Sequence, residues 1–200
     1  MISKEIMSEH AMTGVNKIQA PAVLAIWTDV TAQAEAEFNE WYWREHVPER
    51  LGVPGFLRGS RYRAIEGAPR YFTSYDLESA AVLNSPIYLD RLNNPTTLTR
   101  RVMPNFRSMV RAVCNVVRSV GRGTGSVALT VRFSPRRDQR AKLEAAIAED
   151  LLPSLHKLSG IVCVQYWRAE KPAASSTQEG MLRGSPDASI ESAIVVGATS

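Results

Sequence analysis

The two halves of the chain carry the same pattern at a fixed spacing of 105 residues. The matched positions are Pro48 with Pro153, Gly55 with Gly160, Tyr62 with Trp167, Arg63 with Arg168 and Ala64 with Ala169. Proline and glycine constrain or free the backbone more than other residues do, so their recurrence in register indicates one structural unit used twice. The fold must therefore accommodate two related units in 200 residues.

The first unit shows the order strand, helix, strand, strand, helix, strand. The predicted elements are a buried strand at 22–30, a helix from about 32 that Pro48 ends near His46, a hairpin of strands at 56–65 and 70–77, a short helix at 84–92 and a strand at 109–117. Proline ends the first helix in this interpretation because it lacks a backbone donor. The order βαββαβ is that of the ferredoxin-like unit.

The second unit starts in the same way but is shorter. Residues 127–133 match the first strand, 136–155 match the helix with its proline, and 161–170 match the next strand. A loop rich in proline, serine and glycine at 171–190 then leads to one short strand at 193–197. Either the chain is truncated, or a partner completes the sheet.

We predict an α+β fold of tandem ferredoxin-like repeats that form an α+β barrel, with the second repeat incomplete. The predicted divisions are an N-terminal arm at 1–20, a first repeat that carries the site at 21–118, a linker at 119–126 and a shorter second repeat at 127–200.

Charge and cysteine content exclude several kinds of partner. The formal net charge is +4, and the arginines are scattered singly or in pairs, so nucleic acid binding is not expected. Cys114 and Cys163 stand alone in apolar runs, which predicts neither a zinc site nor a disulfide framework. No window approaches the roughly 18 apolar residues of a membrane span, and the first residues lack the apolar core of a signal peptide. A cytoplasmic location without membrane contact is expected.

The segment 37–56, EFNEWYWREHVPERLGVPGF, concentrates aromatic and titratable residues. Its repeat counterpart meets the same packing need with aliphatic side chains: Leu143, Ala146, Ile147, Asp150 and Leu151 replace Phe38, Trp41, Tyr42, Glu45 and His46. The aromatic group with its histidine therefore exceeds what the fold requires. This difference predicts that function lies in the first half.

The candidate catalytic residues are His46, Tyr42 and Glu45. His46 titrates near neutrality and would transfer the proton, although capping of the last helical carbonyls would also explain it. Tyr42, one turn earlier, would hold a substrate oxygen or simply pack. Glu45 would orient His46 or stand in solvent at the helix end.

The candidate substrate-binding residues are Phe38, Trp41, Arg50, Arg61, Tyr62 and Tyr75. The aromatic rings would wall a small apolar pocket. The arginines would bind a carboxylate through two parallel hydrogen bonds, or form surface ion pairs.

The stretches FNEWYWREHVPERLGVPGF, RYRAIEGAPRYFTSYDLES and SPIYLDRLNNPTTLTRR resemble the dimeric α+β barrel superfamily. The likeness is closest to the ethyl tert-butyl ether degradation (EthD-like) proteins, whose helix ends in an aromatic-x-x-x-His-Val-Pro motif. It covers about 22–117 well and 127–169 more weakly. The resemblance implies a ferredoxin-like sheet paired face to face with a second one. The histidine and the proline of the motif correspond to His46 and Pro48.

These features together predict an acid–base enzyme without a cofactor, of the lyase, isomerase, cyclase or decarboxylase type. Its substrate would be a small apolar molecule, aromatic or lactone-like. A cofactor-free monooxygenase of phenols is the near alternative, and a non-catalytic small-molecule-binding or dimerising accessory protein is the alternative from another class. A heme enzyme with His46 as axial ligand is a further alternative, which a Soret band would reveal. Exposed sheet edges favour a homodimer.

Overall fold

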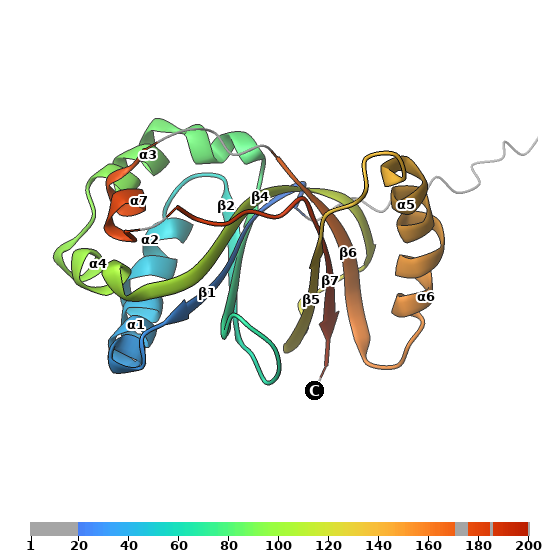
Figure 1. Cartoon of the computed structure of the whole chain (residues 1–200), viewed down its shortest axis with the longest axis horizontal. Coiled ribbons are helices and arrows are strands. Elements are labelled where there is room, and N and C mark those ends of the chain that lie inside the picture. Colours follow the sequence, from blue (N-terminus) through green and yellow to red (C-terminus); the bar gives the residue numbers. More distant parts are fainter. Residues whose placement is uncertain (1–19, 171–175, 185, 200) are drawn as a thin grey trace, which may run out of the picture.

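One antiparallel sheet of seven strands organises the computed structural model, which describes residues 20–170, 176–184 and 186–199 (Figure 1). The strand order across the sheet is β2-β3-β1-β4-β6-β7-β5. The strands are β1 (Ala22–Val30), β2 (Phe56–Arg63), β3 (Tyr71–Leu77), β4 (Phe106–Gly121), β5 (Val127–Phe133), β6 (Ile161–Ala169) and β7 (Ser192–Ala198). The predicted N-terminal arm lies almost wholly outside the described residues.

The strand order confirms the predicted α+β fold with an incomplete second repeat. In the first half the first three strands lie in the order β2-β3-β1, and in the second half they lie in the order β6-β7-β5. In both halves the first strand along the chain therefore lies next to the third, and the third lies next to the second. In the first half β4 follows as the fourth strand, and it also joins the halves by pairing with β6. Among the described residues β5 pairs with β7 alone, so the position of a fourth strand is empty in the second half.

The helices lie on the outer faces of this sheet. Those of the first half are η1 (Ala32–Ala34), α1 (Glu35–Trp41), η2 (Tyr42–His46), α2 (Val47–Leu51), η3 (Ala80–Asn84), α3 (Pro86–Asn93), α4 (Thr97–Val102) and η4 (Met103–Asn105). Those of the second half are α5 (Arg140–Ala146), η5 (Ile147–Leu151), α6 (Leu152–His156) and α7 (Gln178–Leu182). None of the described helices has the length and apolar character needed to cross a membrane.

The prediction that Pro48 ends the first helix is wrong. The helix runs through Pro48 to Leu51 because η2 is a π-helical turn, in which the Val47 N–H donates to the Tyr42 carbonyl five residues back. This wider turn relieves the contact that a proline ring makes with a carbonyl in a regular α-helix. The repeat counterpart η5 has the same π turn, so the two helices match in this irregularity as well.

The sheet curves so that its two halves face each other (Figure 1). The inner side chains of both halves form one core, in which Trp27 stacks on Phe72 with ring centroids 5.0 Å apart and Trp167 packs against Phe72 from the other half. The Trp27 Nε1–H donates to Thr130 Oγ1 at 3.0 Å. These contacts join β1 to β5 although the two strands are not neighbours in the sheet.

The loop predicted at 171–190 contains a helix. Helix α7 begins after Thr177, whose side-chain oxygen accepts from the Gly180 N–H, and the Gln178 N–H donates to Asn93 Oδ1 at 3.3 Å. Although it follows β6 in sequence, α7 lies against α3 and α4 of the first half (Figure 1). The second half of the chain therefore contributes to the outer layer of the first repeat.

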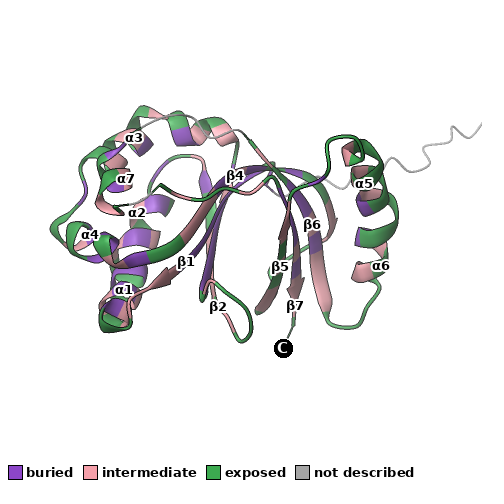
Figure 2. Ribbon diagram, in the orientation of Figure 1, coloured by how far each residue is buried: buried purple, intermediate pink, exposed green. Residues whose placement is uncertain are grey.

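The second repeat leaves apolar side chains exposed where the first repeat covers them (Figure 2). Leu129 is 60% exposed and Val131 48%, whereas their counterparts Leu24 and Ile26 are 2% and 6% exposed. In the first repeat these positions face the helices after Ser79, which have no described counterpart in the second repeat. Among the described residues no helix covers this apolar surface of the second repeat. The homodimer stays a prediction.

The two matched glycines share a backbone conformation but differ in their surroundings, which gives a stability prediction. Gly55 and Gly160 both have positive φ, 93° and 82°, but a Cβ at Gly55 would lie 2.4 Å from Val82 Cγ2, whereas at Gly160 the nearest atom is 3.4 Å away. Gly160→Ala should lower the free energy of unfolding by about 1–2 kcal/mol through backbone strain. Gly55→Ala should cost about 1–3 kcal/mol more, because Val82 must shift. Urea titrations of both variants give the difference, and adding Val82→Ala should remove the excess. Equal losses would contradict this account.

Candidate functional site

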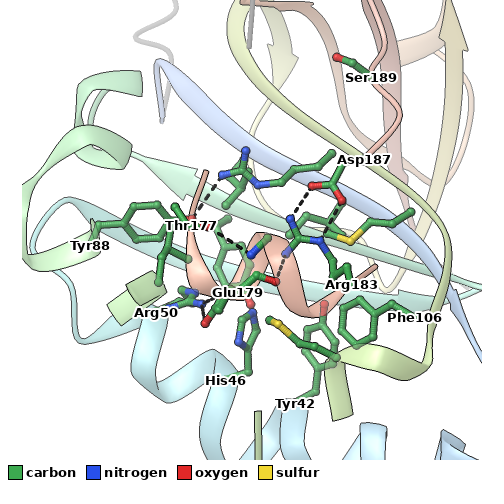
Figure 3. Close-up of a pocket in the computed structure, with 18 residues that line it drawn as sticks. Tyr42, His46, Arg50, Tyr88, Phe106, Thr177, Glu179, Arg183, Asp187 and Ser189 are labelled. Carbon is green, nitrogen blue, oxygen red and sulfur yellow. Dashed lines mark hydrogen bonds and ion pairs between the residues drawn. The ribbon is translucent and has the colours of Figure 1, made fainter. Parts of the chain in front are cut away.

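A cavity of about 200 Å³ lies between the outer face of the first-half sheet and its helices, with α7 across it (Figure 3). Strands β1, β3 and β4 form its floor, because alternate residues of each strand face the helices. Its apolar wall consists of Leu24, Ile26, Leu92, Met103, Phe106 and Met109. Its polar lining includes Tyr42, His46, Arg50, Tyr75, Tyr88, Arg111, Thr177, Glu179, Arg183, Asp187 and Ser189.

The π turn η2 carries two of the candidate residues to this cavity. Tyr42 and His46 are its first and last residues, and both line the cavity. The Trp41 indole stacks on the His46 ring with centroids 4.2 Å apart, and the Tyr42 ring meets His46 edge-on at 5.2 Å. Trp41 is held in turn by its Nε1–H, which donates to Thr99 Oγ1 at 3.0 Å. The imidazole is therefore fixed by packing on two sides.

His46 is electrostatically a neutral base. Its side chain is buried, and no described residue is a hydrogen-bond partner of its Nδ1. Burial, with smaller contributions from the cations Arg50 and Arg183, holds the pKa of His46 well below its ordinary value. Near neutral pH the ring has a lone pair available to accept a proton.

A buried ion pair closes one end of the cavity (Figure 3). Arg50 Nη2 donates to both carboxylate oxygens of Glu179 at 2.6 Å, and the Tyr88 ring faces the Arg50 guanidinium, whose carbon is 5.5 Å from the ring centroid. Burial disfavours the Arg50 cation, but Glu179, Tyr88 and Glu49 together outweigh burial, so the pKa of Arg50 is raised. Burial raises the pKa of Glu179, although Arg50 opposes the rise. The pair ties α2 to α7.

Two tyrosines present hydroxyl groups in the same region. Burial raises the pKa of Tyr42 and, more strongly, that of Tyr75. The Tyr75 hydroxyl has no hydrogen-bond partner among the described residues. Both phenols therefore stay protonated near neutral pH and can donate to a ligand oxygen.

The structure separates the predicted site residues into groups. Tyr42, His46, Arg50 and Tyr75 line the cavity together. The Glu45 carboxylate instead accepts hydrogen bonds from the hydroxyls of Thr96 and Thr99, so it links η2 to α4 and does not orient His46. This geometry corrects the predicted role of Glu45, whose side chain is directed to the start of α4.

The remaining predicted residues lie outside this cavity. Phe38 and Trp41 are fully buried in an aromatic cluster behind the cavity. The Arg61 guanidinium lies 4.4 Å from the centroids of Tyr42 and Tyr71, and its Nη2 donates to Asn39 Oδ1. Tyr62 faces the other side of the sheet, stacks on Phe72 and donates to the Gly125 carbonyl. None of these four residues lines the cavity.

Several cavity residues were not predicted from the sequence. Glu179, Arg183 and Asp187 lie on or after α7, Arg111 lies on β4, and Tyr88 lies on α3. A threonine followed two residues later by a glutamate is a helix-start signal, which could have revealed α7. No local signal indicates that Glu179 meets Arg50, because 129 residues separate them.

One group of potential metal ligands lies at this site. Ligand atoms of His46, Glu49 and Glu179 all lie within 4.8 Å of one another. However, both oxygens of Glu179 already accept from Arg50, whose positive charge opposes a cation at the same place. The arrangement fits an ion pair better than a metal centre.

Comparisons with known proteins establish the fold. No protein-family model matches the chain, and no curated protein matches it. An anthrone oxidase-like protein of known structure is similar with a TM-score of 0.65 at 8% identity, over 91% of this chain and 74% of that chain. A candidate monooxygenase from Fusobacterium nucleatum subsp. nucleatum is similar with a TM-score of 0.53 at 10% identity, over 90% of this chain and 77% of that chain.

The chain thus shares the α+β barrel fold of these two proteins, and at such low identity the likeness shows the fold alone. The heme degrader MhuD from Mycobacterium tuberculosis matches half of the chain at a TM-score of 0.39, which carries no argument. The narrower resemblance to EthD-like proteins stays a prediction.

The cavity does not fit a heme group. Its volume of about 200 Å³ lies below the range of about 300–1,000 Å³ that is typical for drug-sized ligands, so it admits a molecule of one or two rings and not a porphyrin. His46, the candidate axial ligand, is stacked on the Trp41 ring and lies beside the buried Arg50–Glu179 pair, so side chains already occupy both of these sides.

The buried ion pair gives a stability prediction. Glu179→Leu should lower the free energy of unfolding by about 3–5 kcal/mol, because it leaves the Arg50 cation buried without a carboxylate. Adding Arg50→Met should recover most of the loss, since an apolar pair replaces an ionic one. Chemical denaturation of the two single variants and the double variant gives the coupling free energy. Additive losses would contradict a direct pair.

The lowered pKa of His46 predicts a pH dependence of stability. Between the lowered pKa and about 6.5, its value in the unfolded chain, the unfolded state binds a proton that the folded state does not. Stability should therefore fall as the pH falls below 6.5, by up to about 1.4 kcal/mol per pH unit from this group. Denaturant titrations from pH 7.5 to 5.0 should show that His46→Leu removes this slope and His156→Gln keeps it. An unchanged slope in His46→Leu would contradict the lowered pKa.

Proposed function

We propose that the protein is an acid–base enzyme without a bound cofactor, acting on a small, largely apolar molecule in the cavity beneath α7. The observation that carries the proposal is His46, a buried neutral imidazole whose Nδ1 has no described partner, in a cavity with an apolar wall. A base that stays neutral at working pH can accept a proton from a weak acid. Its repeat counterpart is Leu151, which is 40% exposed, so the π turn itself does not require a histidine at this position.

The residues of the cavity define the proposed step. His46 accepts the proton from a carbon or hydroxyl of the substrate, and the electron pair of that bond moves onto the substrate as an enolate or phenolate. The hydroxyls of Tyr75 and Tyr42 donate to the oxygen where this charge develops. The imidazolium then returns its proton to a different substrate atom or to a leaving group, which completes an isomerase, cyclase or lyase reaction. The apolar wall keeps water away from the charged intermediate.

A cofactor-free oxygenase is the second candidate, and the names of two structural neighbours suggest it. The two proteins that share the fold over nine-tenths of the chain carry the names anthrone oxidase-like protein and monooxygenase. The first step is the same, because an enolate or phenolate is electron-rich enough to reduce dioxygen. The carbanion then combines with dioxygen to form a hydroperoxide at a CH2 carbon. Loss of the remaining C–H proton breaks the O–O bond and gives a C=O group and water, so the substrate supplies all four electrons. Consumption of oxygen separates the two candidates.

Replacement of His46 tests the proposal. Candidate substrates are phenols, lactones and aromatic acids, followed by absorbance with and without oxygen and by an oxygen electrode. His46→Leu should lower kcat/KM by about 10²–10⁴-fold on any substrate that the wild-type protein converts. The change should alter stability at pH 7 by no more than about 1–2 kcal/mol, because the repeat tolerates leucine there.

Tyr75→Phe is the companion variant, since it removes one hydroxyl and keeps the ring. It should lower kcat by about 10-fold or more and leave the fold intact, because that hydroxyl has no described partner to lose. His156→Leu, outside the cavity, is the matched control for a lost histidine. A His46→Leu variant that turns over substrate normally but melts far earlier would make His46 a structural residue and refute the proposal.

A further inference from the structure

The charges that line the cavity do not cancel. Arg50 pairs with Glu179, and Arg183 donates to both carboxylate oxygens of Asp187 at 2.8 and 2.7 Å (Figure 3). Arg111 is the third arginine of the lining, and the described residues contain no carboxylate partner for it. Glu49, which does not line the cavity, lies 3.5 Å from Arg50 Nη1 as a second carboxylate for that arginine. Arg111 is therefore the arginine of the lining that lacks a carboxylate partner among the described residues.

The backbone holds Arg111 firmly at the cavity wall. Arg111 lies on β4 opposite Ile26 of β1, and the alternation of the strand turns Met109 and Arg111 to the cavity while Ala112 packs between the two halves of the sheet. The Arg111 N–H donates to the Ala188 carbonyl at 2.9 Å, and the Ala188 N–H donates to the Met109 carbonyl at 3.0 Å. The chain after α7 is thus paired to β4 at the position where the arginine leaves the strand.

Tyr88 connects this arginine to the rest of the site. Arg111 Nη2 donates to the Tyr88 hydroxyl at 3.3 Å, which is its one side-chain hydrogen bond among the described residues. The other face of the contact is Arg50, which lies against the Tyr88 ring and belongs to the same helix as His46. Tyr88 thus contacts both arginines, and Arg111 and His46 line the same cavity.

We propose that Arg111 binds the carboxylate of a small aromatic carboxylic acid and so determines the substrate class of the site. This inference rests on the proposed function, which it makes specific. A guanidinium that is only partly hydrogen-bonded can donate two parallel bonds to a carboxylate. Leu24, Ile26 and Met109 beside it would cover one face of the ring. With its carboxylate on Arg111, the substrate extends through the same cavity and directs its acidic position toward His46.

Binding of benzoate and of its neutral analogue benzamide tests the proposal without turnover. Isothermal titration calorimetry of the full chain should show benzoate binding that Arg111→Gln weakens by about 10–100-fold. Benzamide should bind the wild-type protein more weakly than benzoate and should lose little in Arg111→Gln. Arg111→Lys should lie between, because lysine keeps the charge but not the two parallel bonds. Arg118→Gln on the same strand, at an exposed position outside the cavity, is the matched control and should bind benzoate as the wild type does.

Three results would overturn the inference: no benzoate binding to the wild-type protein, equal affinity for benzoate and benzamide, or benzoate affinity that survives Arg111→Gln. Circular dichroism checks that the Arg111 variants fold, and a variant that does not fold is replaced by Arg111→Met. Benzoate binding in His46→Leu separates this inference from the proposed chemistry. The affinity of His46→Leu for benzoate should stay within about 3-fold of the wild-type value. This result is expected whether or not the same variant loses turnover, so each proposal can fail without the other.

Discussion

The buried ion pair between Arg50 and Glu179 is the interaction on which the site depends. It joins α2, next to the histidine helix turn, to α7, which the chain reaches only after completing β6. A buried arginine without its carboxylate costs several kcal/mol, so α7 is held in place whenever Arg50 is buried. The pair therefore closes one end of the cavity, where burial and, to a smaller extent, the Arg50 charge hold the pKa of His46 low.

The π turn is the second constraint, and it has a structural origin. Both repeats place a proline directly after the same turn, and both helices continue through it. The turn thus belongs to the repeated scaffold and not to the site alone. In the first repeat its two ends carry Tyr42 and His46, whereas Ile147 and Leu151 stand there in the second. In the second repeat the turn buries Ile147 and leaves Leu151 exposed, whereas in the first repeat both positions present polar side chains to a cavity.

The comparison of the two repeats also explains the shape of the molecule. The first repeat has its fourth strand, the helices before it, and α7 from the second half over its outer face. The second repeat keeps three strands and one long helix, and its counterparts of the cavity floor, Leu129 and Val131, are exposed. One outer face has become an enclosed cavity, while the corresponding face of the other half remains an open apolar surface.

The sequence by itself determined the two repeats, the order of their strands, the long helix of each repeat, the incomplete second unit and the concentration of aromatic residues around His46. These follow from local periodicity and from proline and glycine positions, which act through neighbouring backbone. Only the tertiary structure decided that the Glu45 side chain is directed to α4 and that Tyr62 faces the core between the two halves of the sheet. It also decided that Glu179 and Arg111 complete the cavity, because partners separated by many residues leave no local pattern and are selected by the packing of the whole chain.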